Sequence, residues 1–254
     1  MDETGGRPAG DSMTLFLAFS FVFVGFLCGA TSIGGILLIP AIQYSTGMPL
    51  PLASGTALCS FFFTAAWGTW LHWKGGSLQK EIVLPQCIGA MIFGFFGALT
   101  KFVVGAVALN VILALLIILA GVAAFRPPRP VGSMSTEKGR FRYLVFVGSF
   151  AGFMAGLTGM GGPVLSVPMM IVMGFAPFAT VAAAQPFQTF ACLSGSIGNI
   201  LIDQIDWYIA ITSVFLQGVG VWAGIRVARR MDTSLLKKAI ACLCVFTGAC
   251  MMLR

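Results

Sequence analysis

The sequence has very few charged residues. Asp, Glu, Lys and Arg make up 9% of its 254 residues, against about a quarter in an ordinary soluble domain. So few charges cannot cover the surface of a water-soluble protein of this length. A hydrophobic content of 58% and a mean hydropathy of +0.96 suit a chain whose solvent is lipid. The composition excludes a soluble globular domain and predicts an all-α polytopic membrane protein.

Carboxylates are absent from all the long apolar blocks, and histidine occurs once, as His72. The absence weakens three hypotheses: an Asp/Glu proton relay, a carboxylate-bound metal site and an intramembrane aspartyl protease. A serine enzyme would need a Ser–His pair, for which His72 is poorly placed at the end of a span. Because His72 stands beside Trp70, Trp73 and Lys74, we interpret it as an interfacial residue of an aromatic belt, with proton coupling as its alternative role.

The sequence also lacks the patterns of cofactor and metal sites. Its seven cysteines lie in apolar stretches and form no Cys-x-x-Cys pair with matching His or Cys partners, so neither a disulfide framework nor a zinc site is predicted. The net charge of +7 comes from short basic runs between apolar blocks, which is typical of loops beside membrane spans. We therefore expect no cofactor, no metal and no nucleic-acid partner.

The runs without charge follow the same order twice. A long run at 12–73 precedes shorter runs at 82–100 and 102–125, and a long run at 143–202 precedes 207–225 and 239–253. Short motifs repeat as well: Gly25 to Gly29 aligns with Gly152 to Gly156 at an offset of about 127 residues, and Ile33-Gly34-Gly35 aligns with Met160-Gly161-Gly162. Such repeats are typical of secondary transporters. The predicted organisation is an N-terminal tail at 1–12, a first transmembrane repeat at 13–125, a basic cytoplasmic linker at 126–142 and a second repeat at 143–254.

Each long run contains a short segment bounded by glycine and proline. These segments, 35–46 and 163–174, lie between predicted helices at 13–31 and 52–72 in the first repeat, and at 143–158 and 178–202 in the second. Twelve helical residues cover about 18 Å, roughly half a bilayer. Broken backbone at membrane depth survives only where protein shields it or where it lines a cavity. We expect eight long helices, two short ones, and a substrate site beside the short ones.

The residues around the first short segment resemble a known family. Gly-Phe-Leu-Cys-Gly-Ala-Thr-Ser-Ile-Gly-Gly-Ile-Leu-Leu-Ile-Pro at 25–40, followed by Ala-Ser-Gly-Thr-Ala-Leu at 53–58, looks like the TauE/SafE family of permeases. His72 with Gly75-Gly76, and Asp206-Trp207, resemble the family's later motifs. The likeness covers residues 13–253. It implies transport of small sulfur-containing anions such as sulfite, sulfonates or related organic acids.

Candidate binding residues come from the starts of the half-helices and from the polar residues of the helices that follow. Bare N–H groups at a helix N-terminus attract anions, whereas the Gly-x-x-x-Gly pairs suit close helix packing. Amides such as Gln185 are costly in a span unless they have a partner or face a cavity. A neutral cavity of this kind suits an anion better than a cation. The predicted substrate-binding set is Ser32, Gly34, Gly35, Thr56, Ser60, Gly161, Gly162, Gln185, Gln188 and Thr189.

The topology follows from the number of crossings in each repeat. If the short segments cross, each repeat has five passes and the second repeat is inverted. With the linker in the cytoplasm, all but three of the 15 Lys and Arg residues then lie inside, the exceptions being Arg7, Lys101 and Arg254. Re-entrant short segments would give four passes, parallel repeats and an external basic loop at 226–238. The five-plus-five arrangement, with both termini outside, agrees better with the positive-inside rule.

These features predict a multi-pass secondary transporter of the inner (plasma) membrane that moves a small anion. A proton or a sodium ion is the candidate coupling ion, and the expected surroundings are membrane lipid. The sequence is compatible with a homodimer. No G-x-x-x-x-G-K-[ST] loop is present, so ATP is not used in that way. An anion channel and an intramembrane enzyme remain as alternative functions.

Overall fold

The structure is a computed structural model that describes residues 9–100, 114–115, 117–119, 121–122, 137–158, 162–201 and 205–252. These residues form helices joined by short turns, with no strand among them. Seven helices are long and two are short within the described ranges. Their bounds are α1 Ala9–Thr31, α2 Gly35–Thr46, α3 Leu50–Lys74, α4 Lys80–Thr100, α6 Glu137–Thr158, α7 Pro163–Val172, α8 Pro177–Leu201, α9 Trp207–Arg230 and α10 Thr233–Met252.

The two short helices end where the backbone requires glycine. Helix α2 has the predicted bounds 35–46 and stops at Gly47, which has a φ of 69°. Helix α7 ends at Val172, earlier than the predicted 174, because Gly174 has a φ of 90° and the chain turns just before it. Both angles lie in the left-handed region, where glycine carries no Cβ penalty.

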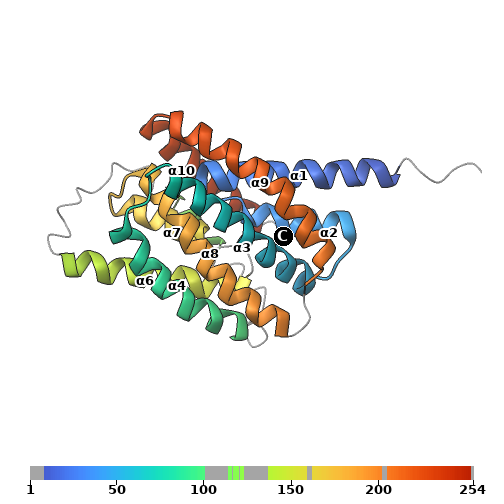
Figure 1. The fold of residues 1–254 in the computed structure, drawn as a ribbon, viewed down its shortest axis with the longest axis horizontal. Coiled ribbons are helices and arrows are strands. Elements are labelled where there is room, and N and C mark those ends of the chain that lie inside the picture. The colour runs from blue at the N-terminus through green and yellow to red at the C-terminus, as the bar shows by residue number, and fades with distance from the viewer. Residues whose placement is uncertain are drawn as a thin grey trace, which may run out of the picture.

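Two helix pairs form the sides of the molecule, α1 with α9 and α4 with α6 (Figure 1). A Cβ on Gly25 or Gly29 of α1 would collide with the backbone of Gln217 or Val221 of α9. In the second pair, Gly148, Gly152 and Gly156 of α6 meet Gln86, Ala90 and Gly94 of α4 in the same way. Residue numbers rise together in each pair, so both pairs are parallel. The predicted packing role of the Gly-x-x-x-Gly motifs is confirmed, because only glycine permits such close approach.

Helices α3 and α8 cross between these two pairs (Figure 1). Gly68 of α3 faces Gln185 of α8, whereas Leu58 of α3 faces Gly195 of α8. Numbers rise along one helix as they fall along the other, so α3 and α8 are antiparallel. Helix α8 also packs against α4, and α3 against α9. The crossing thus joins elements from both halves of the chain.

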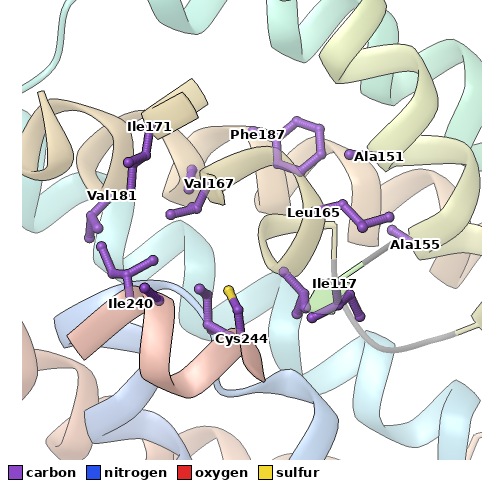
Figure 2. Packing of buried hydrophobic residues seen from close by; sticks show 14 of the residues in the cluster. Ile117, Ala151, Ala155, Leu165, Val167, Ile171, Val181, Phe187, Ile240 and Cys244 are labelled. Atoms are coloured by element: carbon purple, nitrogen blue, oxygen red, sulfur yellow. The ribbon is translucent and has the colours of Figure 1, made fainter. Parts of the chain in front are cut away.

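The largest buried apolar cluster among the described residues lies where α7 meets α6, α8 and α10. Val167 of α7, Phe187 of α8 and Ile240 of α10 belong to it, together with Ala151 and Ala155 of α6 (Figure 2). All five side chains are buried. A second cluster surrounds α2 and contains residues of α1, α3 and α9. Both short helices are therefore shielded by protein, as broken segments at membrane depth must be.

The outer surface is apolar. Phe215 is 73% exposed, and Leu15 and Phe19 are each 70% exposed. Within the described residues, α4, α6 and α9 are long and apolar enough to cross a membrane. An exposed apolar surface of this kind suits contact with lipid rather than with water.

One predicted boundary differs from the structure, and another lies mostly outside the described residues. Helix α6 begins at Glu137, so it includes residues that the sequence analysis placed in the linker 126–142 and starts before the predicted 143. Glu137 and Lys138 are exposed there, and a carboxylate in the first turn of a helix is favourable, so these charged residues did not stop the helix. The predicted helix at 102–125 lies mostly outside the described residues.

Candidate functional site

The turn between α1 and α2 is sharp and buried. Ser32 follows α1 directly and has a φ of 60°, the one positive value at a non-glycine position among the described residues. Its amide donates to Cys28 O at 2.9 Å, and the Ile33 amide donates to Thr31 Oγ1 at 3.2 Å. A side chain in left-handed backbone is strained, and such strain concentrates at functional sites. The turn fixes the Ser32 hydroxyl close to the N-terminus of α2.

Gln185 of α8 is hydrogen-bonded to this turn. Its Nε2 donates to Cys28 O at 2.8 Å and to Ser32 Oγ at 3.2 Å. The Ser32 hydroxyl in turn donates to Val181 O at 3.1 Å. Ser32 and Gln185 are 2% and 1% exposed. These bonds, which we call the α1–α8 latch, connect the two halves of the chain through Ser32, Gln185, Cys28 and Val181.

Helix α3 also packs against the latch. A Cβ on Gly68 would collide with Gln185 Oε1 and lie 2.9 Å from its Cδ. One turn along α8, Thr189 Oγ1 lies 3.3 Å from Thr69 Oγ1. Glycine at position 68 is thus what lets the Gln185 amide lie against α3.

The start of α2 supplies backbone donors beside the latch. Its N-cap is Gly34, and no side chain caps the helix there. The amides of Gly35 and Ile36 have no acceptor within the helix, whereas the Leu37 amide donates to Gly34 O at 3.2 Å. Gly34 itself lies against α1, since a Cβ on it would be 2.6 Å from both Cys28 Sγ and Val24 O. The structure therefore brings together Ser32, Gly34, Gly35, Gln185 and Thr189 of the predicted set.

Thr56 and Ser60 lie in a second polar cluster. Thr56 Oγ1 accepts from the amide of Asp206 at 2.9 Å, and Ser60 Oγ accepts from Gln217 Nε2 at 3.4 Å. Ser60 and Gly68 are about 12 Å apart along α3, at 1.5 Å per residue. The two hydroxyls therefore lie nearer the start of α9 than the latch does.

The glycine at the start of α7 has apolar surroundings. A Cβ on Gly162 would lie 2.5 Å from the Phe187 ring and 3.0 Å from Ala151 O. Phe187 and Ala151 lie side by side in Figure 2. The next residue, Pro163, has no N–H to offer a ligand. Gln188 is buried on α8, and Gly161 lies outside the described residues.

His72 does not face the surface. Its side chain is 0% exposed, and its ring lies 5.8 Å from that of Phe178 on α8. Neither ring nitrogen has a hydrogen-bond partner in the structure. Trp73, by contrast, is 72% exposed. The aromatic-belt interpretation is therefore wrong for His72, because one residue along a helix is a 100° turn and places it on the face that packs against α8.

Sequence reasoning missed several buried polar residues. Gln217 and Gln86 are fully buried, and the cost of an amide in a span, which singled out Gln185, applies equally to them. Gly68 had a signal too, since an offset of about 127 pairs it with Gly195 and pairs Leu58 with Gln185. Extending the repeat alignment along α3 and α8 would have found it.

The comparisons with known proteins agree with this architecture. The family "Sulfite exporter TauE/SafE" matches residues 15–251. A probable membrane transporter protein of Bacillus subtilis (strain 168), YunE, is 24% identical over 240 residues, covering 85% of this chain and 88% of its own length. A second from the same organism, YjnA, is 21% identical over 252 residues, covering 93% and 98%. No solved structure matches the chain significantly. The match over nearly the whole length shows that this chain belongs to the TauE/SafE family of membrane transporters.

Proposed function

We propose that this protein is a secondary transporter that binds a small sulfur-containing anion, such as sulfite or a sulfonate, at the α1–α8 latch. The observation that carries the proposal is the bonding of Ser32 and Gln185 across the two halves of the chain. The described residues of the latch carry no charge, and they lie beside the uncapped start of α2. Hydroxyl, amide and helix N-terminus are all donors that favour an anion.

The latch donors bond to backbone carbonyls in this conformation. Gln185 Nε2 donates to Cys28 O, and Ser32 Oγ donates to Val181 O. An anionic oxygen is a stronger acceptor than a neutral carbonyl, because charge-assisted hydrogen bonds are about twice as strong. A bound anion would take these donors from the carbonyls and so release α1 from α8. In this mechanism substrate binding itself permits the two halves to move, as alternating access requires.

The proposed topology is five crossings in each half, with the second half inverted. If the short segments were re-entrant, α3 and α8 would be the second and sixth crossings and would run the same way. Five crossings per half make them the third and eighth, which run in opposite directions. The antiparallel contacts of Gly68 with Gln185 and of Leu58 with Gly195 support the second arrangement. The basic ends of α3 and α9 and the start of α6 then share the cytoplasmic face of the inner membrane.

Labelling of single cysteines in intact cells tests this topology. In a background without the native cysteines, a cysteine at position 5 is expected to react with an impermeant maleimide, while one at position 234 reacts only after permeabilisation. Reaction of the second but not the first would contradict the ten-crossing arrangement.

His72 is the candidate for proton coupling. It is buried with no hydrogen-bond partner, and the Arg229 guanidinium, which donates to Leu71 O at 3.1 Å, is the cation next to it. Protonation of an imidazole beside this guanidinium would repel α9 from the end of α3. If coupling uses His72, the variant His72→Asn keeps exchange of the anion but loses uptake driven by a pH gradient.

Flux in proteoliposomes tests the function. Purified protein in liposomes loaded with unlabelled sulfite is expected to accumulate ³⁵S-sulfite from outside by counterflow, with saturation. An unsaturable ohmic current would instead show an anion channel. Absence of flux for sulfite, alkanesulfonates and small carboxylates, together with turnover of a lipid or peptide, would show an intramembrane enzyme and contradict the proposal.

A further inference from the structure

A cavity of about 770 Å³ lies at the N-terminal ends of α4 and α6. It is lined by four cationic side chains, those of Lys80, Lys138, Arg140 and Arg142. Two carboxylates, Glu81 and Glu137, also line it, which leaves an excess of two positive charges. The volume lies in the range of pockets that hold small ligands or head groups.

The cations of this cavity are not neutralised by the neighbouring acids. Within the part of the chain that the structure describes, none of the four forms an ion pair with Glu81 or Glu137. The two acids stand in the first turns of α4 and α6, where they offset the positive ends of the helix dipoles. Arg140 stacks over the Phe175 ring at 5.1 Å, and its Nε is buried without a partner. The cavity therefore has a cationic lining with an excess of two positive charges.

The mouth of the cavity is continuous with a lipid-facing surface. Leu84 and Phe141 line it, and they are 57% and 50% exposed. From Leu84 an exposed apolar stripe runs down α4 through Ile88 and Met91, which share one helix face at spacings of four and three residues. In Figure 1, α4 and α6 form one outer edge of the bundle. A molecule seated here would place an anionic group in the cavity and an apolar chain along the stripe.

We propose that this cavity binds the head group of an anionic glycerophospholipid, whose acyl chain lies on the α4 stripe. Basic pockets between helices at a membrane surface recognise such head groups. Glycerophospholipid is favoured over a soluble anion because only a lipid would also cover Leu84, Ile88 and Met91. The lipid would join α4 to α6, which belong to different halves of the chain, and would stabilise their contact. The site is separate from the latch, so the proposal does not depend on the transported substrate.

The test compares lipids and two matched double variants of the detergent-purified protein. Native mass spectrometry is expected to show retained phosphatidylglycerol, and phosphatidylglycerol but not phosphatidylcholine should raise the thermal unfolding temperature. The variant Lys138→Gln with Arg142→Gln should bind phosphatidylglycerol about 30-fold more weakly. The control Arg230→Gln with Lys238→Gln removes two exposed basic residues elsewhere and should bind as the wild type does.

Three results would overturn the proposal. Equal weakening in both double variants would show unspecific attraction to the basic surface. An equal thermal shift with inorganic phosphate alone would identify a soluble anion as the ligand. Unchanged binding in the Lys138/Arg142 variant would place the lipid elsewhere. Should that variant fail to fold, Leu84→Gln is a second test, because it leaves the cationic lining intact. It is expected to weaken binding of phosphatidylglycerol with long acyl chains but not binding of a short-chain analogue. If Leu84→Gln binds both lipids as the wild type does, the acyl chain does not lie on the α4 stripe.

Discussion

Each end of the α3–α8 crossing pairs a glycine of one helix with a larger side chain of the other, but the chemistry of the two ends differs. At one end Gly68 of α3 faces Gln185, and at the other Gly195 of α8 faces Leu58. The Gly68 end holds an amide bonded to a strained turn, whereas the Gly195 end has ordinary apolar contact, its nearest atom being 3.5 Å from a Cβ. The repeated framework thus positions side chains at both ends, but only the Gly68 end has buried hydrogen-bond donors that an anion could use.

The starts of the short helices differ in the same sense. Helix α2 begins at Gly35 beside Ser32 and Gln185, whereas α7 begins with Pro163 and its preceding Gly162 packs on Phe187. The first start offers amides and the second offers an apolar ring. Both differences favour the end of α1 for the proposed anion site.

The largest expected effect follows from removing the amide of the latch. Gln185→Leu has nearly the same size but donates to neither Cys28 O nor Ser32 Oγ. Counterflow of sulfite should fall about 100-fold, because a hydrogen bond to a charged group contributes about 1.5–3 kcal/mol. The reciprocal change at the other end, Leu58→Gln, should leave counterflow much closer to wild type. Equal losses in the two variants, measured at equal amounts of folded protein, would contradict a special role for the Gln185 amide.

An intermediate effect is expected from adding one methyl group at each glycine. In Gly68→Ala the new Cβ collides with Gln185 Oε1, so the amide must leave its position. In Gly195→Ala the methyl meets Leu58 at ordinary contact distance. Counterflow should fall about tenfold in the first variant, equivalent to about 1.4 kcal/mol, and stay near wild type in the second. A larger loss in Gly195→Ala would show that the crossing is sensitive to packing rather than to the amide.

The smallest effect separates the hydroxyl of Ser32 from its backbone strain. Ser32→Ala keeps the Cβ in left-handed backbone and removes the hydroxyl, whereas Ser32→Gly removes both. Counterflow should fall several-fold in each, since each loses one donor. The glycine variant alone should gain stability to unfolding, by about 1 kcal/mol. If Ser32→Gly transports at the wild-type rate, the serine serves the turn and not the substrate.

The sequence predicted best where local chemistry decides the structure. Glycine and proline delimit α2, so its bounds could be predicted, and the cost of a buried amide pointed to Gln185. Helix faces could not be assigned in the same way, because a helix in lipid is apolar on its outer face as well as its inner one and its pattern has little amphipathicity. That is why His72 was assigned to the surface. The opposition of Gly68 and Gln185 depends on the register between α3 and α8, which no single segment encodes.

Direct binding of the anion tests the central claim with no transport step. Sulfite or an alkanesulfonate is titrated, under nitrogen and in detergent, into the wild type, Gln185→Leu and Leu58→Gln, and the heat is measured by isothermal titration calorimetry. If the latch is the anion site, the wild type and Leu58→Gln bind saturably, and Gln185→Leu binds about 100-fold more weakly at an unchanged unfolding temperature. Wild-type affinity in a folded Gln185→Leu variant would contradict the assignment of the latch as the anion site.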